Sequence, residues 1–125
     1  MIAKPNILMW NARGLLAKSG QKIEELMLAA NIIQAMLICV TETCLNNTVN
    51  DGEIEIPGYK LLRQDRDREK SKKTKGGGVV VYIRSDLDVE KETKYAEKDA
   101  EIVCFNTKGE DRMIIVVYRR PGQHI

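Results

Sequence analysis

The sequence predicts an α/β (α+β) layered domain in which a mixed, mostly antiparallel sheet is covered by one helix. The chain has 125 residues, of which 43% are hydrophobic, and this is enough for one small domain with its own core. Only residues 21–34 show the three- and four-residue apolar spacing of a surface helix. Most of the second half consists of short β-branched runs separated by turn residues. We therefore expect one domain over residues 1–125.

The first forty residues have the pattern of a strand–helix–strand unit. Residues 6–10 form a compact apolar run, and Ser19 or Gly20 can cap the helix that follows. Residues 36–40 form a second apolar run, which is too short for a helix. Because a right-handed crossover returns such a strand parallel to the first, we expect both strands to end at one edge of the sheet.

The second half has the pattern of an antiparallel sheet. Strands are predicted over residues 58–62, 78–83 and 87–93, and a hairpin joins residues 102–107 to 112–118. Two of these runs, residues 79–83 and 113–118, are apolar at nearly every position, which indicates burial on both faces. We expect a second covering layer that this chain does not encode. The isolated chain should then expose an apolar sheet face and self-associate or aggregate.

The small net charge of +2 conceals a basic segment beside an acidic one. Residues 60–75 contain eight basic and three acidic side chains, whereas residues 86–101 contain seven acidic and three basic ones. The basic segment is interpreted in three ways that stay open: a solvated loop, a contact with nucleic-acid phosphates, or a nuclear-localisation signal over residues 70–75.

Cysteine usage and hydropathy indicate an intracellular protein with no membrane partner. Three cysteines and a lone His124 argue against a disulfide framework and against a zinc site. The N-terminus lacks the pattern of a signal peptide, and polar residues interrupt the longest apolar stretch, residues 26–40.

Polar side chains stand at the ends of the two predicted parallel strands. Asn11 ends the first strand and Glu42 ends the second. A carboxylate beside an amide is a plausible binding point for a hard divalent cation, and ordinary solvation of strand ends is the alternative.

A further feature is the glycine triplet, residues 76–78, which follows the basic segment. Because a strand rather than a helix follows it, close backbone packing is favoured over a phosphate-binding loop.

Five short motifs then follow one another along the chain. They are Trp10-Asn11-Ala12-Arg13-Gly14, Thr41-Glu42-Thr43, Gly58-Tyr59 with Arg63-Gln64-Asp65-Arg66, Gly76-Gly77-Gly78-Val79, and Tyr118-Arg119-Arg120-Pro121. Together they resemble the endonuclease/exonuclease/phosphatase superfamily. The resemblance is strongest to the apurinic-endonuclease-like nuclease domain of non-LTR (LINE-type) retrotransposons. It runs through nearly the whole chain and implies the N-terminal half of a DNase I-like layered sandwich.

The resemblance implies a phosphodiesterase that depends on Mg²⁺ or Mn²⁺ and nicks DNA, and such a protein acts in the nucleus. By motif position, Asn11 matches the superfamily's phosphate- or metal-site asparagine and Glu42 its metal-binding glutamate. Tyr118 matches the tyrosine that contacts the scissile phosphate. The chemistry needs such groups, because the metal offsets phosphate charge while amide and phenol donors hold the phosphoryl group.

Several positions depart from the superfamily pattern. Thr41 replaces the glutamine usual before the glutamate, and Cys44 stands where tryptophan is common. Arg13 occupies a position that is acidic in apurinic endonucleases, which suits the retrotransposon branch better.

The superfamily's later Asp-x-Asn and Ser-Asp-His motifs do not occur up to Ile125, and His124 does not match in context. Loss of a general base alone typically lowers a rate by roughly 10² to 10⁴. We therefore expect this chain to be nearly inactive by itself. A non-catalytic DNA-binding or relic fragment is the alternative function.

Overall fold

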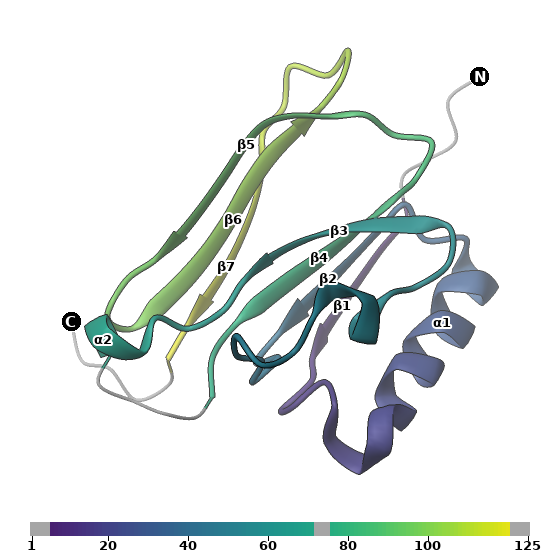
Figure 1. Ribbon diagram of the computed structural model, residues 1–125. Coiled ribbons are helices and arrows are strands. Elements are labelled where there is room, and N and C mark those ends of the chain that lie inside the picture. The colour runs from purple at the N-terminus through teal and green to yellow at the C-terminus, as the bar shows by residue number, and fades with distance from the viewer. Residues whose placement is uncertain (1–5, 72–75, 121–125) are drawn as a thin grey trace.

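The computed structural model describes residues 6–71 and 76–120, which form two β-sheets and a covering helix (Figure 1). The first sheet contains β1 (Ile7–Asn11), β2 (Leu37–Thr41), β3 (Tyr59–Gln64) and β4 (Val79–Arg84). The second contains β5 (Val89–Ala96), β6 (Ala100–Thr107) and β7 (Ile114–Arg119). The helices are α1 (Gln21–Ile33) and the short α2 (Arg68–Ser71), with 3₁₀ turns at Ala17–Gly20 and Asp51–Ile54. The predictions for Lys72, Lys73, Lys75, Pro121 and His124 lie outside the described residues.

The first sheet has the strand order β1-β2-β4-β3 and contains the predicted strand–helix–strand unit. β1 and β2 are parallel, and Asn11 lies opposite Thr41 in their register. The helix α1 connects them and ends one residue before the predicted boundary, because Gln34 adopts a left-handed conformation with φ 54°. This unit brings the carboxyl ends of β1 and β2 to one edge, as predicted.

A helix-side core fills the space between α1 and the outer face of the first sheet. The helix contributes Ile23, Leu26 and Ala30, which are spaced three and four residues apart and therefore share one face. The sheet contributes residues that alternate along its strands, including Ile38, Val40, Val80 and Tyr82.

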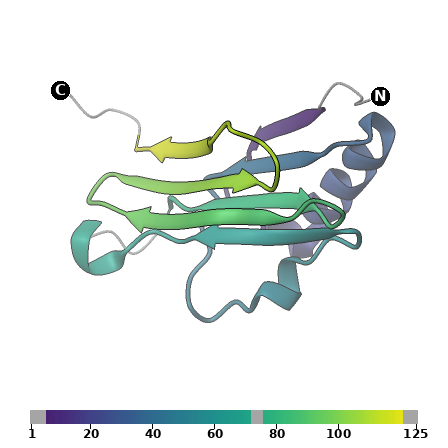
Figure 2. The ribbon, with the colours of Figure 1, turned by 90° about the horizontal axis from the view of Figure 1, so that it is seen from above.

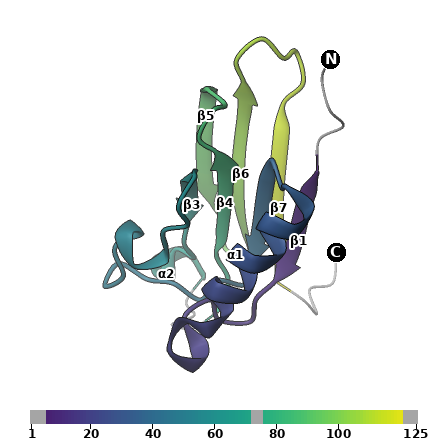
Figure 3. The same cartoon turned by 90° about the vertical axis from the view of Figure 1, so that its right-hand side faces the viewer.

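An inter-sheet core fills the space between the two sheets, which pack face to face (Figures 2 and 3). The first sheet contributes the alternate residues that point away from α1, and the second sheet contributes inward-pointing residues of β6 and β7. The members are Leu37, Cys39, Val79, Val81, Ile83, Val103, Phe105, Val116 and Tyr118. Every residue of β4 from Val79 to Ile83 is therefore fully buried, because the helix covers one face of the strand and the second sheet covers the other.

The prediction that this chain lacks its second covering layer is wrong. Burial of residues 79–83 on both faces is confirmed, but the covering layer is the chain's own sheet β5-β6-β7. The error comes from assigning all the strands to one sheet. The turn after β4 instead leads into a second antiparallel sheet that folds back over the first.

Strand β7 does not repeat the double burial of β4. Its side chains alternate, so that Val116 and Tyr118 enter the inter-sheet core while Ile115 and Val117 are 57% and 51% exposed. These two side chains are exposed on the outer face of the second sheet, and Ile7 and Met9 of β1 and Leu28 and Ile32 of α1 are exposed as well. Among the described residues, no helix is both long enough and apolar enough to cross a lipid bilayer.

Candidate functional site

The carboxyl ends of β1, β2 and β7 lie at the same end of the molecule (Figure 1), and a contact between Tyr118 and Glu42 brings two of the three predicted site residues together. The Tyr118 hydroxyl donates a hydrogen bond to Glu42 Oε1. Burial raises the pKa of Tyr118 well above its usual range, and the hydrogen bond to Glu42 and the charge of Glu42 raise it further. The phenol therefore stays protonated at neutral pH and acts as a donor.

Glu42 has a strained backbone. Its φ is 50°, in the left-handed region that glycine favours, and Cys44 two residues later has a φ of 56°. Such a conformation costs a non-glycine residue about 1–2 kcal/mol and persists only where the surroundings fix it. The segment that carries the carboxylate is thus held in place by its neighbours.

The loop after β1 holds this segment from one side. The carbonyl oxygens of residues 41–43 each accept a backbone hydrogen bond from this loop. The donors are the N–H groups of Ala12, Gly14 and Leu15, at 2.8, 2.8 and 2.9 Å respectively. These bonds extend the β1–β2 pairing past the ends of both strands.

The glycine triplet holds the segment from the other side. The Cys44 N–H donates to the Gly77 carbonyl at 2.9 Å, and the Thr43 N–H donates to the Gly78 carbonyl at 3.4 Å. A Cβ added to Gly78 would collide with the Thr43 hydroxyl, and Gly78 has a φ of 96°. The triplet therefore allows close backbone packing, as predicted, and the strand β4 follows it.

Asn11 lies at the same edge but does not contact the pair directly. It is exposed at the end of β1, and its side chain makes no hydrogen bond with any other described residue. On the helix side of this strand end, the Lys22 ammonium donates to the Ala12 carbonyl and lies 5.9 Å from the centre of the Trp10 ring. This cation gives the end of β1 a positive potential that attracts anions.

The donor set at this edge fits a hard cation that keeps most of its water shell. Among the described residues, no three His, Cys, Asp or Glu side chains are grouped to hold a metal. Mg²⁺ is commonly bound through only one or two carboxylates, with water and substrate oxygens completing its shell. The half-buried Glu42 carboxylate and the Asn11 amide oxygen are ligands of this kind.

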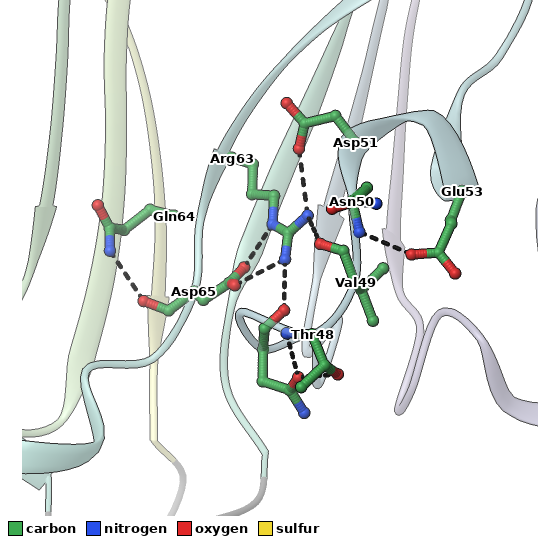
Figure 4. Close-up of polar contacts among 9 residues, drawn as sticks. Thr48, Val49, Asn50, Asp51, Glu53, Arg63, Gln64 and Asp65 are labelled. Carbon is green, nitrogen blue, oxygen red and sulfur yellow. Dashed lines mark hydrogen bonds and ion pairs between the residues drawn. The ribbon is translucent and has the colours of Figure 1, made fainter.

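The loop that follows this segment is fixed by Arg63 (Figure 4). The guanidinium group makes two bonds to Asp65, at 2.9 and 2.8 Å, and another to Asp51 at 3.1 Å. It also donates to the carbonyl groups of Asn46 and Val49, both at 2.8 Å. This matches the planar, five-donor geometry of arginine, which a lysine cannot reproduce.

Sequence reasoning missed a buried ion pair next to the glycine triplet. The Glu101 side chain on β6 is fully buried, accepts a hydrogen bond from the Gly78 N–H and lies 3.9 Å from Arg66 Nε. Burial raises the pKa of Glu101, against the lowering effects of Gly78 and Arg66. Strand alternation contains the signal, because Glu101 shares the inward face with Val103 and Phe105.

The basic segment divides between the interior and the surface. Arg63 and Arg66 are largely buried and paired with carboxylates of this chain, so they do not belong to a solvated loop. Arg68 and Lys70 are exposed, although the Lys70 ammonium also donates to the Ala96 carbonyl at 2.9 Å. Among the described cations of this segment, the exposed ones remain available to a nucleic acid.

No protein-family model matches the chain, and no curated protein matches it. Solved structures match it over nearly its whole length. The AP endonuclease LMAP from Leishmania major aligns with a TM-score of 0.65 at 15% identity, over 92% of this chain and 39% of that one. TDP2 from D. rerio, complexed with a single-strand DNA product, aligns with a TM-score of 0.62 at 9% identity, over 93% and 45%. The fold is DNase I-like.

The endonuclease domain of TRAS1, a telomere-specific non-LTR retrotransposon, has the same DNase I-like fold. It aligns with a TM-score of 0.50 at 16% identity, over 93% of this chain and 44% of that one. This chain therefore spans less than half the length of each of the three structures. The resemblance to endonuclease/exonuclease/phosphatase proteins that the motifs indicate is confirmed at the level of the fold.

Proposed function

We propose that this chain is the N-terminal half of a phosphodiesterase domain that nicks DNA with Mg²⁺ or Mn²⁺, of the kind found in non-LTR retrotransposons. The observation that carries the proposal is the hydrogen bond from Tyr118 to Glu42, two motif residues that stand 76 positions apart. They meet at the edge where Asn11 ends the neighbouring strand. The coverage of less than half of each of the three structures reported above supports the assignment to a half-domain.

Each residue has a distinct role in this proposal. Glu42, with Asn11 beside it, holds the metal ion, which when bound neutralises phosphate charge and stabilises the leaving oxygen. When the phosphate binds, the Tyr118 hydroxyl turns its single proton from Glu42 to a phosphoryl oxygen, and the Asn11 amide donates to another, so that both orient the phosphate. The strained backbone at Glu42 keeps the carboxylate in one position, so that no reorganisation is needed when substrate binds.

The DNA partner and the location are part of the same proposal. The cation Lys22 and the exposed Arg13 lie at the end of β1, where a phosphate backbone would pass the site. Chromosomal DNA as substrate implies an intracellular, nuclear site of action. Self-association stays a prediction and now rests on the exposed side chains of β7, Ile115 and Val117.

Plasmid nicking and metal binding test the function together. We expect this chain to nick only slowly and Glu42→Ala to lower the residual Mg²⁺-dependent nicking to background, because metal assistance supplies several kcal/mol of transition-state stabilisation. Glu110→Ala is the matched control, since Glu110 is an exposed glutamate outside the site. It should nick like the wild-type protein.

Mn²⁺ binding, measured by electron paramagnetic resonance, tests the metal site even if the nicking activity is too weak to measure. The wild-type chain and Glu110→Ala should bind one Mn²⁺, and Glu42→Ala should bind it at least about tenfold more weakly. If Glu42→Ala matches the wild type in both nicking and Mn²⁺ binding, the enzyme proposal fails. Retained DNA binding in a gel-shift assay would then favour the non-catalytic DNA-binding fragment.

A further inference from the structure

We propose that Glu101 is a positioning residue for the Glu42–Tyr118 pair, a role that rests on the function proposed above. Glu101 touches neither a substrate position nor the Glu42 side chain. It acts through the glycine triplet on one side and through strand pairing on the other, and so fixes the two members of the pair relative to each other.

The link to Glu42 runs through two consecutive steps of hydrogen bonding. The Glu101 carboxylate accepts the Gly78 N–H. The carbonyl groups of Gly77 and Gly78 accept the N–H groups of Cys44 and Thr43, the residues that directly follow Glu42. The Glu101 side chain therefore orients the turn that holds the strained segment.

The link to Tyr118 is a direct cross-strand neighbour relation. Glu101 and Tyr118 are Cα partners in the antiparallel register of β6 and β7, and both point into the space between the sheets. Side chains of such partners have Cβ atoms about 4.5–5.5 Å apart on the same face. Glu101 thus limits the positions that the Tyr118 ring can occupy.

The chemistry of Glu101 argues for a role beyond packing. Its side chain is fully buried, and the guanidinium of Arg66, whose side chain is 8% exposed, lies beside it. A buried ion pair is often no more stable than well-packed apolar residues of similar volume, so stability alone does not explain one. A carboxylate here supplies an acceptor for a turn that an apolar side chain could not hold. The absence of a Cβ at Gly77 makes room for the pair, since one built there would lie 2.5 Å from both Glu101 Oε1 and Arg66 Nε.

Two near-isosteric variants test the proposal by amide hydrogen exchange. Glu101→Gln keeps an acceptor oxygen at the same reach, whereas Glu101→Asp keeps the charge but withdraws the oxygen from the Gly78 N–H. We expect Glu101→Asp to speed exchange of the Thr43 and Cys44 amides roughly tenfold or more relative to the Val81 amide in the inter-sheet core. Glu101→Gln should stay within about twofold of the wild type by the same comparison.

The control for global destabilisation is Val103→Ala. Val103 is equally buried on the same face of the same strand, so its truncation should change the exchange of Thr43, Cys44 and Val81 in parallel. Equal exchange in the Asp and Gln variants, or changes that only run parallel with Val81, would overturn the positioning role.

Mn²⁺ binding adds a readout that depends on the proposed function. Glu101→Asp should weaken Mn²⁺ binding about tenfold, as is typical when a residue that orients a metal ligand is changed, and Glu101→Gln and Val103→Ala should not. Equal affinity in Glu101→Asp and the wild type would overturn the positioning role. A wild-type chain that binds no Mn²⁺ contradicts the proposed function, whereas the exchange comparison still decides whether Glu101 orders the segment.

Discussion

The two sheets of this molecule are built from similar apolar strands but differ in how they are covered. The first sheet has α1 on one face and, over β2, β3 and β4, the second sheet on the other, whereas the second sheet is covered by described residues on one face only. In β4 every residue from Val79 to Ile83 is buried, while β7 alternates between buried and exposed side chains. An apolar sequence therefore allows a strand to be buried on both faces. Whether it is buried on both depends on the layers that pack against its sheet.

The largest expected loss of stability comes from removing a large side chain from the inter-sheet core. Phe105→Ala should lower the free energy of unfolding by about 3–5 kcal/mol, because a fully buried ring is replaced by a cavity. Urea denaturation measures this loss. Ile102→Ala on the outer face of the same strand is the control, and an equal loss there would contradict the difference in cover.

A smaller loss is expected at the junction where the two sheets meet the site. Gly78→Ala should cost about 2–4 kcal/mol, since it combines a left-handed backbone with a collision against Thr43. Gly109→Ala, at a φ of 86° with nothing within 4 Å of the added Cβ, isolates the backbone cost of about 1 kcal/mol. Thermal unfolding of both variants gives the comparison, and equal losses would show that the close packing at Gly78 is unimportant.

The charge buried beside the inter-sheet core should make stability depend on pH. Because burial raises the pKa of Glu101 above its ordinary value of 4.5, the folded protein binds that proton more tightly than the unfolded chain does. The contribution of Glu101 to the free energy of unfolding therefore falls as the pH rises from about 4.5 through the raised pKa. Arg66 and the Gly78 N–H limit the effect, and Asp65 adds to it.

Urea denaturation between pH 4 and pH 8 tests this dependence. The wild type should lose stability relative to Glu101→Gln as the pH rises, because glutamine does not titrate. A difference that grows in favour of the wild type would contradict the assigned direction.

The smallest effect on stability is expected on the outer face of the second sheet. Ile115→Thr should change the free energy of unfolding by no more than about 0.5 kcal/mol, because the side chain is already 57% exposed. The same change should reduce light scattering at high protein concentration if this face drives self-association. Unchanged scattering would show that this face does not drive self-association.

Local features of the fold could be predicted from the sequence, whereas the assignment of strands to sheets could not. The helix at residues 21–33 and the hairpin of β6 and β7 follow from apolar spacing and turn residues that lie close together in the chain. Whether the chain stays in one sheet after β4 depends on which distant strand covers β4. The pattern of apolar residues does not show which segment covers β4, because a sheet of this chain and a layer from elsewhere would bury the same β4 side chains.

Some residues of the candidate site could also be predicted from the sequence, whereas others depend on contacts between distant segments. Glu42 and Asn11 could be placed at one edge from parallel pairing alone, and their roles with Tyr118 remain proposals drawn from motif resemblance. Arg66 and Glu101 stand in segments that the sequence describes only as basic and acidic. Their burial depends on β6 packing over the glycine triplet, which is a contact between segments more than twenty residues apart.

The cluster around Arg63 also affects the entropy of the chain. The long connection from β2 to β3 would sample many conformations as a free loop, and its closure would oppose folding. By binding the carbonyl groups of Asn46 and Val49 from the end of β3, one guanidinium divides that connection into shorter segments. The Arg63 guanidinium therefore acts as a non-covalent cross-link within this connection. The strained turn at Glu42 thus leads into a connection whose conformations are already restricted before any substrate arrives.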